Sequence, residues 1–178
     1  QKGIKELLLA ITEVAQKCDV LLLVAGSKWF GKTTKDKFSA ELERISQPIK
    51  NNVQFLGYVP HQQIRLLNEL ADVVVVPSIW EEPAGRVALE AQAVGTPIII
   101  SDAGGLSEYV SEDSSIVVQR NDAFVSSLAM AILDVLEHPK KAKKMGEVGI
   151  NYALSYTEKR YYEEILTELD VLGDEDHE

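Results

Sequence analysis

The chain has 178 residues, of which 46% are hydrophobic and 26% charged, a composition typical of one globular domain with its own core. Its net charge of −10 argues against a nucleic-acid backbone as the main partner, because binding many phosphates needs clustered Lys and Arg. One phosphorylated small ligand, held by one or two basic groups, remains compatible with this charge.

Apolar runs and helical patterns alternate along most of the chain. In chain order, they predict a helix over residues 3–17, strands over 20–26 and 53–59, a helix over 61–70, a strand over 72–78, a helix over 86–94, strands over 97–102 and 114–119, and helices over 122–138, 140–154 and 157–172. The strands are continuous apolar runs, which is typical of a parallel sheet buried on both faces. The alternation predicts an α/β fold of the Rossmann-like, doubly wound type with right-handed crossovers.

Other features of the sequence set limits on this domain. The acidic segment 173–178 is expected to be a frayed tail. The single cysteine, Cys18, cannot form an internal disulfide and fits a reducing compartment, so we expect a cytoplasmic protein. No apolar run reaches the ~18 residues that a bilayer-spanning helix needs.

The number of strands indicates that one strand is missing from the sheet. In a doubly wound sheet of order 3-2-1-4-5-6, the first strand is central, and the five runs fit positions 2 to 6. We therefore expect the first strand upstream of Gln1, so that runs 20–26 and 72–78 flank a gap. Ligands bind at the carboxyl ends of the strands where the order reverses, between strands 1 and 4. Lys2 and the segment 79–85 fall at that point.

Segment 79–97 carries the most informative residues. Glu82 lies in the loop, Gly85 precedes the predicted helix, and Glu90 lies within it. Arg86 and Glu90 could form an ordinary i,i+4 pair, and Glu82 could be a first-turn acid favoured by the helix dipole. The apolar neighbours of Glu90 favour a largely buried carboxylate with a defined partner. The N–H groups that open the helix are a ready anion site, and a bound anion would offset the unfavourable placement of Arg86 at this end of the helix. The alternative is a surface Arg86 bonded to Glu82 or Glu90.

The run from Glu82 to Pro97 resembles the Glu-x7-Glu signature of retaining glycosyltransferases of family 4 (group 1), which have the GT-B fold. The similarity covers nearly the whole chain as the C-terminal, donor-binding domain, residues 1–172. It rests on these further segments: Lys2-Gly3 with its helix, Asn52 to Pro60, Ala71 to Ser78, Gly104 to Glu108, and Ser155 to Leu169.

This resemblance implies a donor substrate, a nucleoside-diphosphate sugar, and a role for each matched position. Glu82 would bond the sugar hydroxyls at the reacting centre, and Glu90 would bond the ribose. Lys2 would pair with a diphosphate oxygen. The remaining donor-binding positions are backbone ones: Gly85, Arg86 and Val87 for the diphosphate, Tyr58 and Val59 for the base. An N-terminal acceptor domain, which this chain lacks, would bind an acceptor glycan or lipid-linked glycan, so the isolated chain is expected to be inactive.

Two departures from the family pattern stand out. Ala84 occupies a position that is usually aromatic, and the family's Arg upstream of the Lys is not in this chain.

Two other functions stay open. Gly26 to Thr33 match the P-loop pattern after an apolar strand, although Trp29 and Phe30 are bulky for a loop that wraps a phosphate. A P-loop NTPase is therefore an alternative, and so is a noncatalytic nucleotide-sugar-binding module.

The remaining polar residues suggest simpler interpretations. His61 follows Pro60 and is expected to cap a helix. Asp, Glu and His show no metal-ligand spacing, so we expect no metal held by the protein. The Lys-rich run 140–144 is expected to be a solvated helix face, with peripheral contact to an anionic membrane as the alternative.

Overall fold

The computed structural model describes residues 2–26 and 37–175. The elements are, in order, α1 (Ile4–Val14), β1 (Leu22–Ala25), α2 (Lys37–Ser46), the 3-10 helix η1 (Gln47–Ile49), β2 (Val53–Gly57), α3 (His61–Leu70), β3 (Val74–Val76), α4 (Arg86–Ala93), β4 (Ile98–Ser101), the 3-10 helix η2 (Gly104–Tyr109), β5 (Ser115–Val118), α5 (Phe124–Glu137), α6 (Pro139–Ser155) and α7 (Glu158–Glu175). The predicted strands are confirmed, although each is shorter than its apolar run. Helix α2 was not predicted.

The strands are all parallel and form two sheets. Strand β1 pairs with β2, and β3, β4 and β5 pair in that order. Neither β1 nor β3 pairs with another described strand along its second edge. The sheet is therefore divided between β1 and β3, the two runs that the strand count expects to flank a gap.

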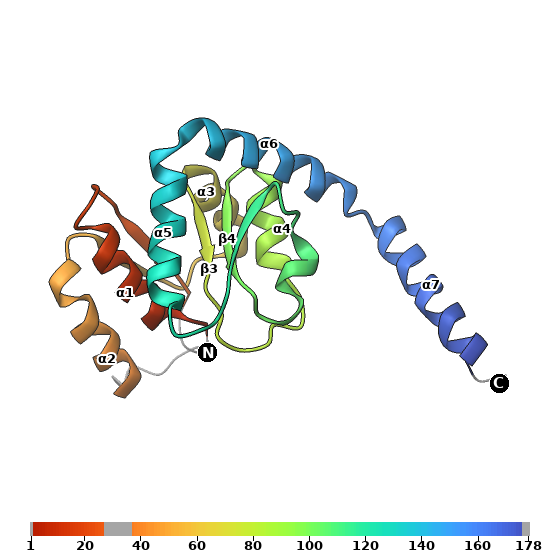
Figure 1. Cartoon of the computed structure of the whole chain (residues 1–178), viewed down its shortest axis with the longest axis horizontal. Helices are drawn as coiled ribbons and strands as arrows, with labels where there is room; N and C mark the ends of the chain where they lie inside the picture. The colour runs from red at the N-terminus through yellow and green to blue at the C-terminus, as the bar shows by residue number, and fades with distance from the viewer. Residues whose placement is uncertain (1, 27–36, 176–178) are drawn as a thin grey trace.

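Strand β4 shows how the layers are built. All four of its residues are buried, because it lies between β3 and β5 and is covered on both faces. Ile99 packs into the cluster that includes α1 and α5, whereas Ile98 and Ile100 pack against Ala88 and Ala91 of α4. Figure 1 shows α5 and α4 on opposite sides of β3 and β4. This is the layered α/β architecture that the sequence predicts.

Helix α1 positions the start of the chain against the sheet. Its buried face, with Leu7, Leu8 and Ile11, packs in the core beside α5. Gly3 caps the helix with a φ of 67°, and a Cβ built on Gly3 would lie 1.6 Å from the carbonyl oxygen of Pro77. Only glycine allows this close approach, which places Lys2 beside the loop that follows β3.

The C-terminal helices differ in how they pack. Helix α6 begins at Pro139, where the missing N–H costs nothing. It crosses α4 closely, since a Cβ on Gly146 would lie 2.0 Å from the carbonyl oxygen of Gly95. Helix α7 extends away from the rest of the molecule (Figure 1) and reaches Glu175, beyond its predicted end at residue 172.

Candidate functional site

The loop between β3 and α4 carries Glu82 at the carboxyl end of the sheet. The backbone of this loop is fixed by η2, because the N–H of Gly105 donates to the carbonyl of Glu82 at 2.8 Å. A Cβ on Gly104 would lie 2.5 Å from the same carbonyl oxygen, so the two loops meet backbone to backbone. Gly104 and Gly105, at the start of η2, therefore support the loop that carries Glu82.

The carboxylate of Glu82 is held by groups from two elements. Lys2 Nζ donates to Oε1 at 2.6 Å and to Oε2 at 2.9 Å, and Ser78 Oγ donates to Oε1. The Glu82 side chain is 9% exposed, whereas that of Lys2 is 69% exposed. Ser78 is fixed in turn, because Ser101 Oγ at the end of β4 donates to its carbonyl at 2.6 Å. Two of the predicted site residues, Lys2 and Glu82, thus meet across 80 positions of sequence.

Glu82 stays ionised despite its burial. Burial alone would raise the pKa of this carboxyl, but hydrogen bonds from Lys2, Ser78 and Trp80 outweigh it and hold the pKa below its usual range. The Lys2 ammonium also lies 5.0 Å from the centre of the Trp80 ring. The result is a buried, charged acceptor next to an exposed cation, which suits a ligand with both hydroxyls and phosphate.

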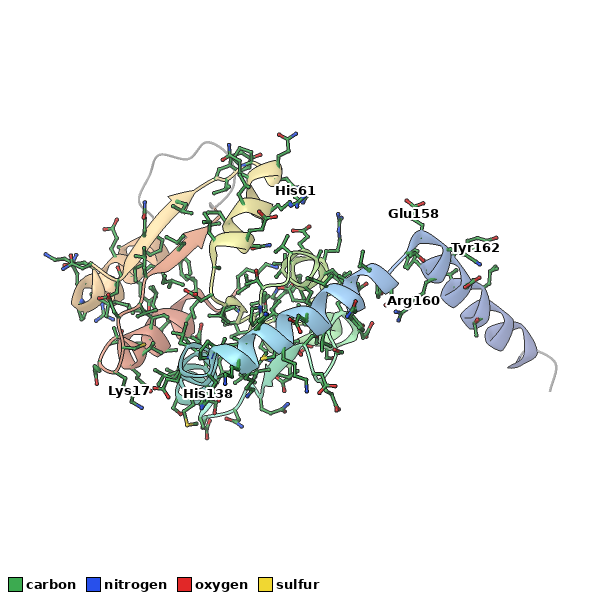
Figure 2. The ribbon with its side chains drawn as sticks, turned by 90° about the horizontal axis from the view of Figure 1, so that it is seen from above. Lys17, His61, His138, Glu158, Arg160 and Tyr162 are labelled. Carbon is green, nitrogen blue, oxygen red and sulfur yellow. The ribbon has the colours of Figure 1, made fainter. Side chains whose placement is uncertain are left out.

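Glu90 has a different partner from the one expected on its own helix. Its Oε1 lies 3.2 Å from Nε2 of His61, the first residue of α3 (Figure 2). No ion pair joins Glu90 to Arg86 within the described part of the chain. The Glu90 side chain is half-buried, with 32% of its surface exposed, and its partner is His61. The interpretation of His61 as a helix cap is wrong, since Pro60 occupies the cap position and no side chain caps α3.

The N-terminus of α4 is open and lies close to the Glu82 loop. Gly85 is buried against Tyr109, where a Cβ would lie 2.7 Å from the Tyr109 Cβ. Arg86 and Val87 are exposed. No hydrogen bond within the described residues uses their backbone N–H groups, as is usual for the first turn of a helix. These groups provide donors for an anion.

The loop after β2 approaches the site through His61. Tyr58 is exposed and Val59 half-buried, and both lie between Gly57 and the start of α3. The N–H of Gly26 donates to the carbonyl of Gly57 at 2.8 Å, which joins the carboxyl ends of β1 and β2. The contact between His61 and Glu90 then connects this loop to α4.

Arg120 lies at the edge of the site, and the sequence did not predict a role for it. It follows β5 and donates to Asp102 Oδ1 at 3.0 Å, to the Asp102 carbonyl at 2.8 Å and to Glu81 Oε1 at 2.8 Å. It therefore ties together the ends of β4 and β5 and the loop that carries Glu82. A lone Arg after a strand gives no sequence signal for such a role.

The other candidate features give no second site. Of the P-loop-like run from Gly26 to Thr33, only Gly26 is among the described residues. Within residues 2–26 and 37–175, no three His, Cys, Asp or Glu side chains form a group that could hold a metal ion. In the same residues, none of the helices combines the length and apolar character needed to cross a membrane.

Known structures have this fold. Sucrose-phosphate synthase from Thermosynechococcus elongatus superposes with a TM-score of 0.72 and 31% identity, over 98% of this chain and 42% of that one. HepE from Anabaena in complex with UDP gives a TM-score of 0.79 and 25% identity, over 96% and 45%. The C-terminal domain of a group 1 family protein from Francisella tularensis gives 0.76 at 22% identity, over 87% and 79%. The chain thus has the fold of the C-terminal domain of GT-B glycosyltransferases.

Sequence comparison identifies the family. The family model of glycosyl transferases group 1 matches residues 1–152, and the chain belongs to this family. Spore coat protein SA of Bacillus subtilis is 32% identical over 82% of this chain and 39% of its own length. A GDP-mannose-dependent phosphatidylinositol monomannoside mannosyltransferase of Corynebacterium glutamicum is 30% identical over 84% and 38%. The chain therefore spans about two fifths of the length of these relatives.

Proposed function

We propose that this chain is the donor-binding domain of a retaining glycosyltransferase that uses a nucleoside-diphosphate sugar. The observation that carries the proposal is the contact between Lys2 and Glu82 beside the open N-terminus of α4. One cation, one buried carboxylate and free N–H groups are the donors and acceptors that a sugar diphosphate needs. The relationship to HepE, whose structure contains UDP, supports a nucleotide-sugar ligand.

In this proposal, each residue binds a different part of the donor. Glu82 accepts hydrogen bonds from the sugar hydroxyls, and Glu90 accepts them from the ribose. The backbone N–H groups from Gly85 to Val87 meet the diphosphate. The backbone of Tyr58 and Val59 faces the base.

Lys2 has two alternative partners in this mechanism. In the unliganded chain its ammonium binds Glu82, and because it is 69% exposed, it can turn to a diphosphate oxygen at little cost in desolvation. Glu82 still accepts from Ser78, and the positions that Lys2 occupied on its carboxylate become available for the sugar. Lys2 and the helix N–H groups stabilise the leaving diphosphate, and departure of this group drives transfer with retention. No side chain serves as a permanent nucleophile in this scheme.

The site proposed for this chain binds the donor and not the acceptor. We infer that a partner domain supplies the acceptor site for a glycan or lipid-linked glycan, and that the 178 residues bind donor without transferring sugar. A cytoplasmic location, with peripheral contact to a membrane as the alternative, fits such an acceptor. A module that binds nucleotide sugars without catalysis would have the same donor site.

Calorimetry with UDP, GDP and ADP tests donor binding. We expect one of them to bind and Glu90→Ala to weaken it by roughly 10- to 150-fold, because a charged hydrogen bond contributes about 1.5–3 kcal/mol. Glu69→Ala, which removes an exposed carboxylate of α3 paired with Arg65, is the control and leaves affinity unchanged. Binding that survives Glu90→Ala but is lost in Lys32→Ala favours the P-loop alternative. No binding to any of the three refutes the proposal.

A further inference from the structure

His61 is placed where two parts of the proposed nucleotide site meet. It follows the loop after β2 and begins α3, and Figure 2 shows it at that end of the helix. Its Nε2 reaches Oε1 of Glu90, 29 residues further along the chain, at 3.2 Å. The contact joins the segment proposed to face the base with the carboxylate proposed to bind the ribose.

His61 is also the one group that fixes the Glu90 carboxylate. Among the described residues, no other side chain or backbone group hydrogen-bonds or pairs with it. The Glu90 side chain is half-buried, with 32% of its surface exposed, so part of the carboxylate can reach a ligand. With Oε1 engaged by the imidazole, Oε2 stays available to accept a hydroxyl. A free glutamate must lose rotamer freedom when it binds, and a preset one loses less.

We propose that His61 is a positioning residue that orients Glu90 toward the ribose hydroxyls and thereby favours ribonucleotides over deoxyribonucleotides. This inference rests on the proposed function, because it takes Glu90 as the ribose-binding carboxylate. The imidazole donates whenever Nε2 carries the proton, in the neutral tautomer or in the imidazolium. His61 acts through Glu90 and makes no contact with the reacting atoms.

The size of the effect follows from the exposure of the pair. The His61 side chain is 78% exposed, and hydrogen-bonded pairs of this kind contribute little in water. We therefore expect His61→Ala to weaken binding of the ribonucleotide about two- to fivefold. His61→Gln, whose amide Nε2 can donate to the same carboxylate, should restore most of the affinity.

Calorimetry on the full 178-residue chain tests this inference. UDP, GDP and ADP are measured first, and the one that binds is compared with its 2′,3′-dideoxy analogue. We expect His61→Ala to weaken the ribonucleotide while leaving the dideoxy analogue within about 1.5-fold, since that analogue has no hydroxyl for Glu90. In the Glu90→Ala background, His61→Ala should have no further effect. Arg65→Ala is the matched control, because Arg65 also lies exposed on α3 and pairs with a glutamate, Glu69, at 2.8 Å.

Each outcome distinguishes this inference from the proposed function. If Glu90→Ala weakens binding but His61→Ala does not, the positioning role is refuted and the proposed function stands. Equal weakening of both nucleotides, or an effect of His61→Ala that persists without Glu90, also refutes it and indicates direct or structural action. If none of the three nucleotides binds, or if Glu90→Ala is without effect, both the inference and the proposed function fail.

Discussion

Replacing Glu82 with glutamine removes a buried charge from the site while keeping the shape of the side chain. The amide oxygen can still accept from Ser78, which is 1% exposed, but the charged contact with Lys2 is lost. Because the lowered pKa of Glu82 means that the fold favours the ionised form, the substitution must reduce stability at neutral pH. A stabilised variant would contradict this.

The magnitude follows from the two contacts. The Lys2 partner is 69% exposed, so its ion pair contributes between zero and about 1 kcal/mol. Exchanging a charged acceptor for a neutral one at Ser78 costs about 1 kcal/mol. We expect Glu82→Gln to lower stability by about 1–2 kcal/mol, or Tm by roughly 2–8 °C for a domain of this size. Glu82→Ala leaves the Ser78 hydroxyl without an acceptor and should cost about 1–3 kcal/mol more.

Urea unfolding at several pH values separates the contribution of the Glu82 charge to the free energy of unfolding from that of side-chain packing. A carboxyl with a lowered folded-state pKa stabilises the fold above its unfolded-state pKa, about 4.3 for Glu, and this stabilisation disappears as pH falls through the folded-state pKa. The difference between wild type and Glu82→Gln should therefore be constant from about pH 7 to 5.5 and shrink below about pH 4.5. Glu108→Gln, an exposed acid on η2, serves as the control. A difference that stays constant or grows on acidification would refute the reasoning.

Two glycine substitutions test close backbone approaches in the fold, and a third serves as a control. Gly3→Ala combines a φ of 67° with a Cβ only 1.6 Å from the Pro77 carbonyl oxygen, and should cost about 3 kcal/mol or more in urea unfolding. Gly57→Ala has the same φ but open space around its Cβ, so about 1 kcal/mol is expected; equal losses would show that contact with Pro77 is unimportant. Gly146→Ala gains helix propensity of about 1 kcal/mol, yet its Cβ would lie 2.0 Å from the Gly95 carbonyl oxygen. We expect a lower Tm by calorimetry, and a raised Tm would contradict the close crossing of α6 over α4.

Local patterns in the sequence predict which elements form better than they predict the residues at which each element begins and ends. The run 97–102 contains β4, Ile98–Ser101, all of which is buried, because an apolar run between two helices fits only a central strand. The run 72–78 overestimates β3, Val74–Val76, because its last residues leave the ladder to form the loop that carries the site. Pro77 and Ser78 are buried although they lie outside the strand, so burial alone does not mark where β3 ends.

The missed elements and contacts depend on partners that local patterns do not reveal. Helix α2 has Phe38, Leu42 and Ile45 at helical spacing, a signal that could have predicted it. The partner of Arg120 just after β4, Asp102, is 18 residues away and that on the Glu82 loop, Glu81, is 39 away, so no periodicity connects them. Strand counting succeeded with Lys2 and Glu82 because it uses the order of the sheet rather than local sequence.

The aromatic surface beside Glu82 comes from a different position in the loop from the one that the family pattern suggests. The sequence has Ala84 where the resemblance implies an aromatic residue, which leaves the packing beside Glu82 undefined. In the structure, the Lys2 ammonium lies 5.0 Å from the centre of the Trp80 ring, and Trp80 is 39% exposed. An exposed indole beside a carboxylate and a cation offers a flat apolar face and a donor at the same place. The loop after β3 thus provides its aromatic group before Glu82 rather than after it, on the side where Lys2 joins the site.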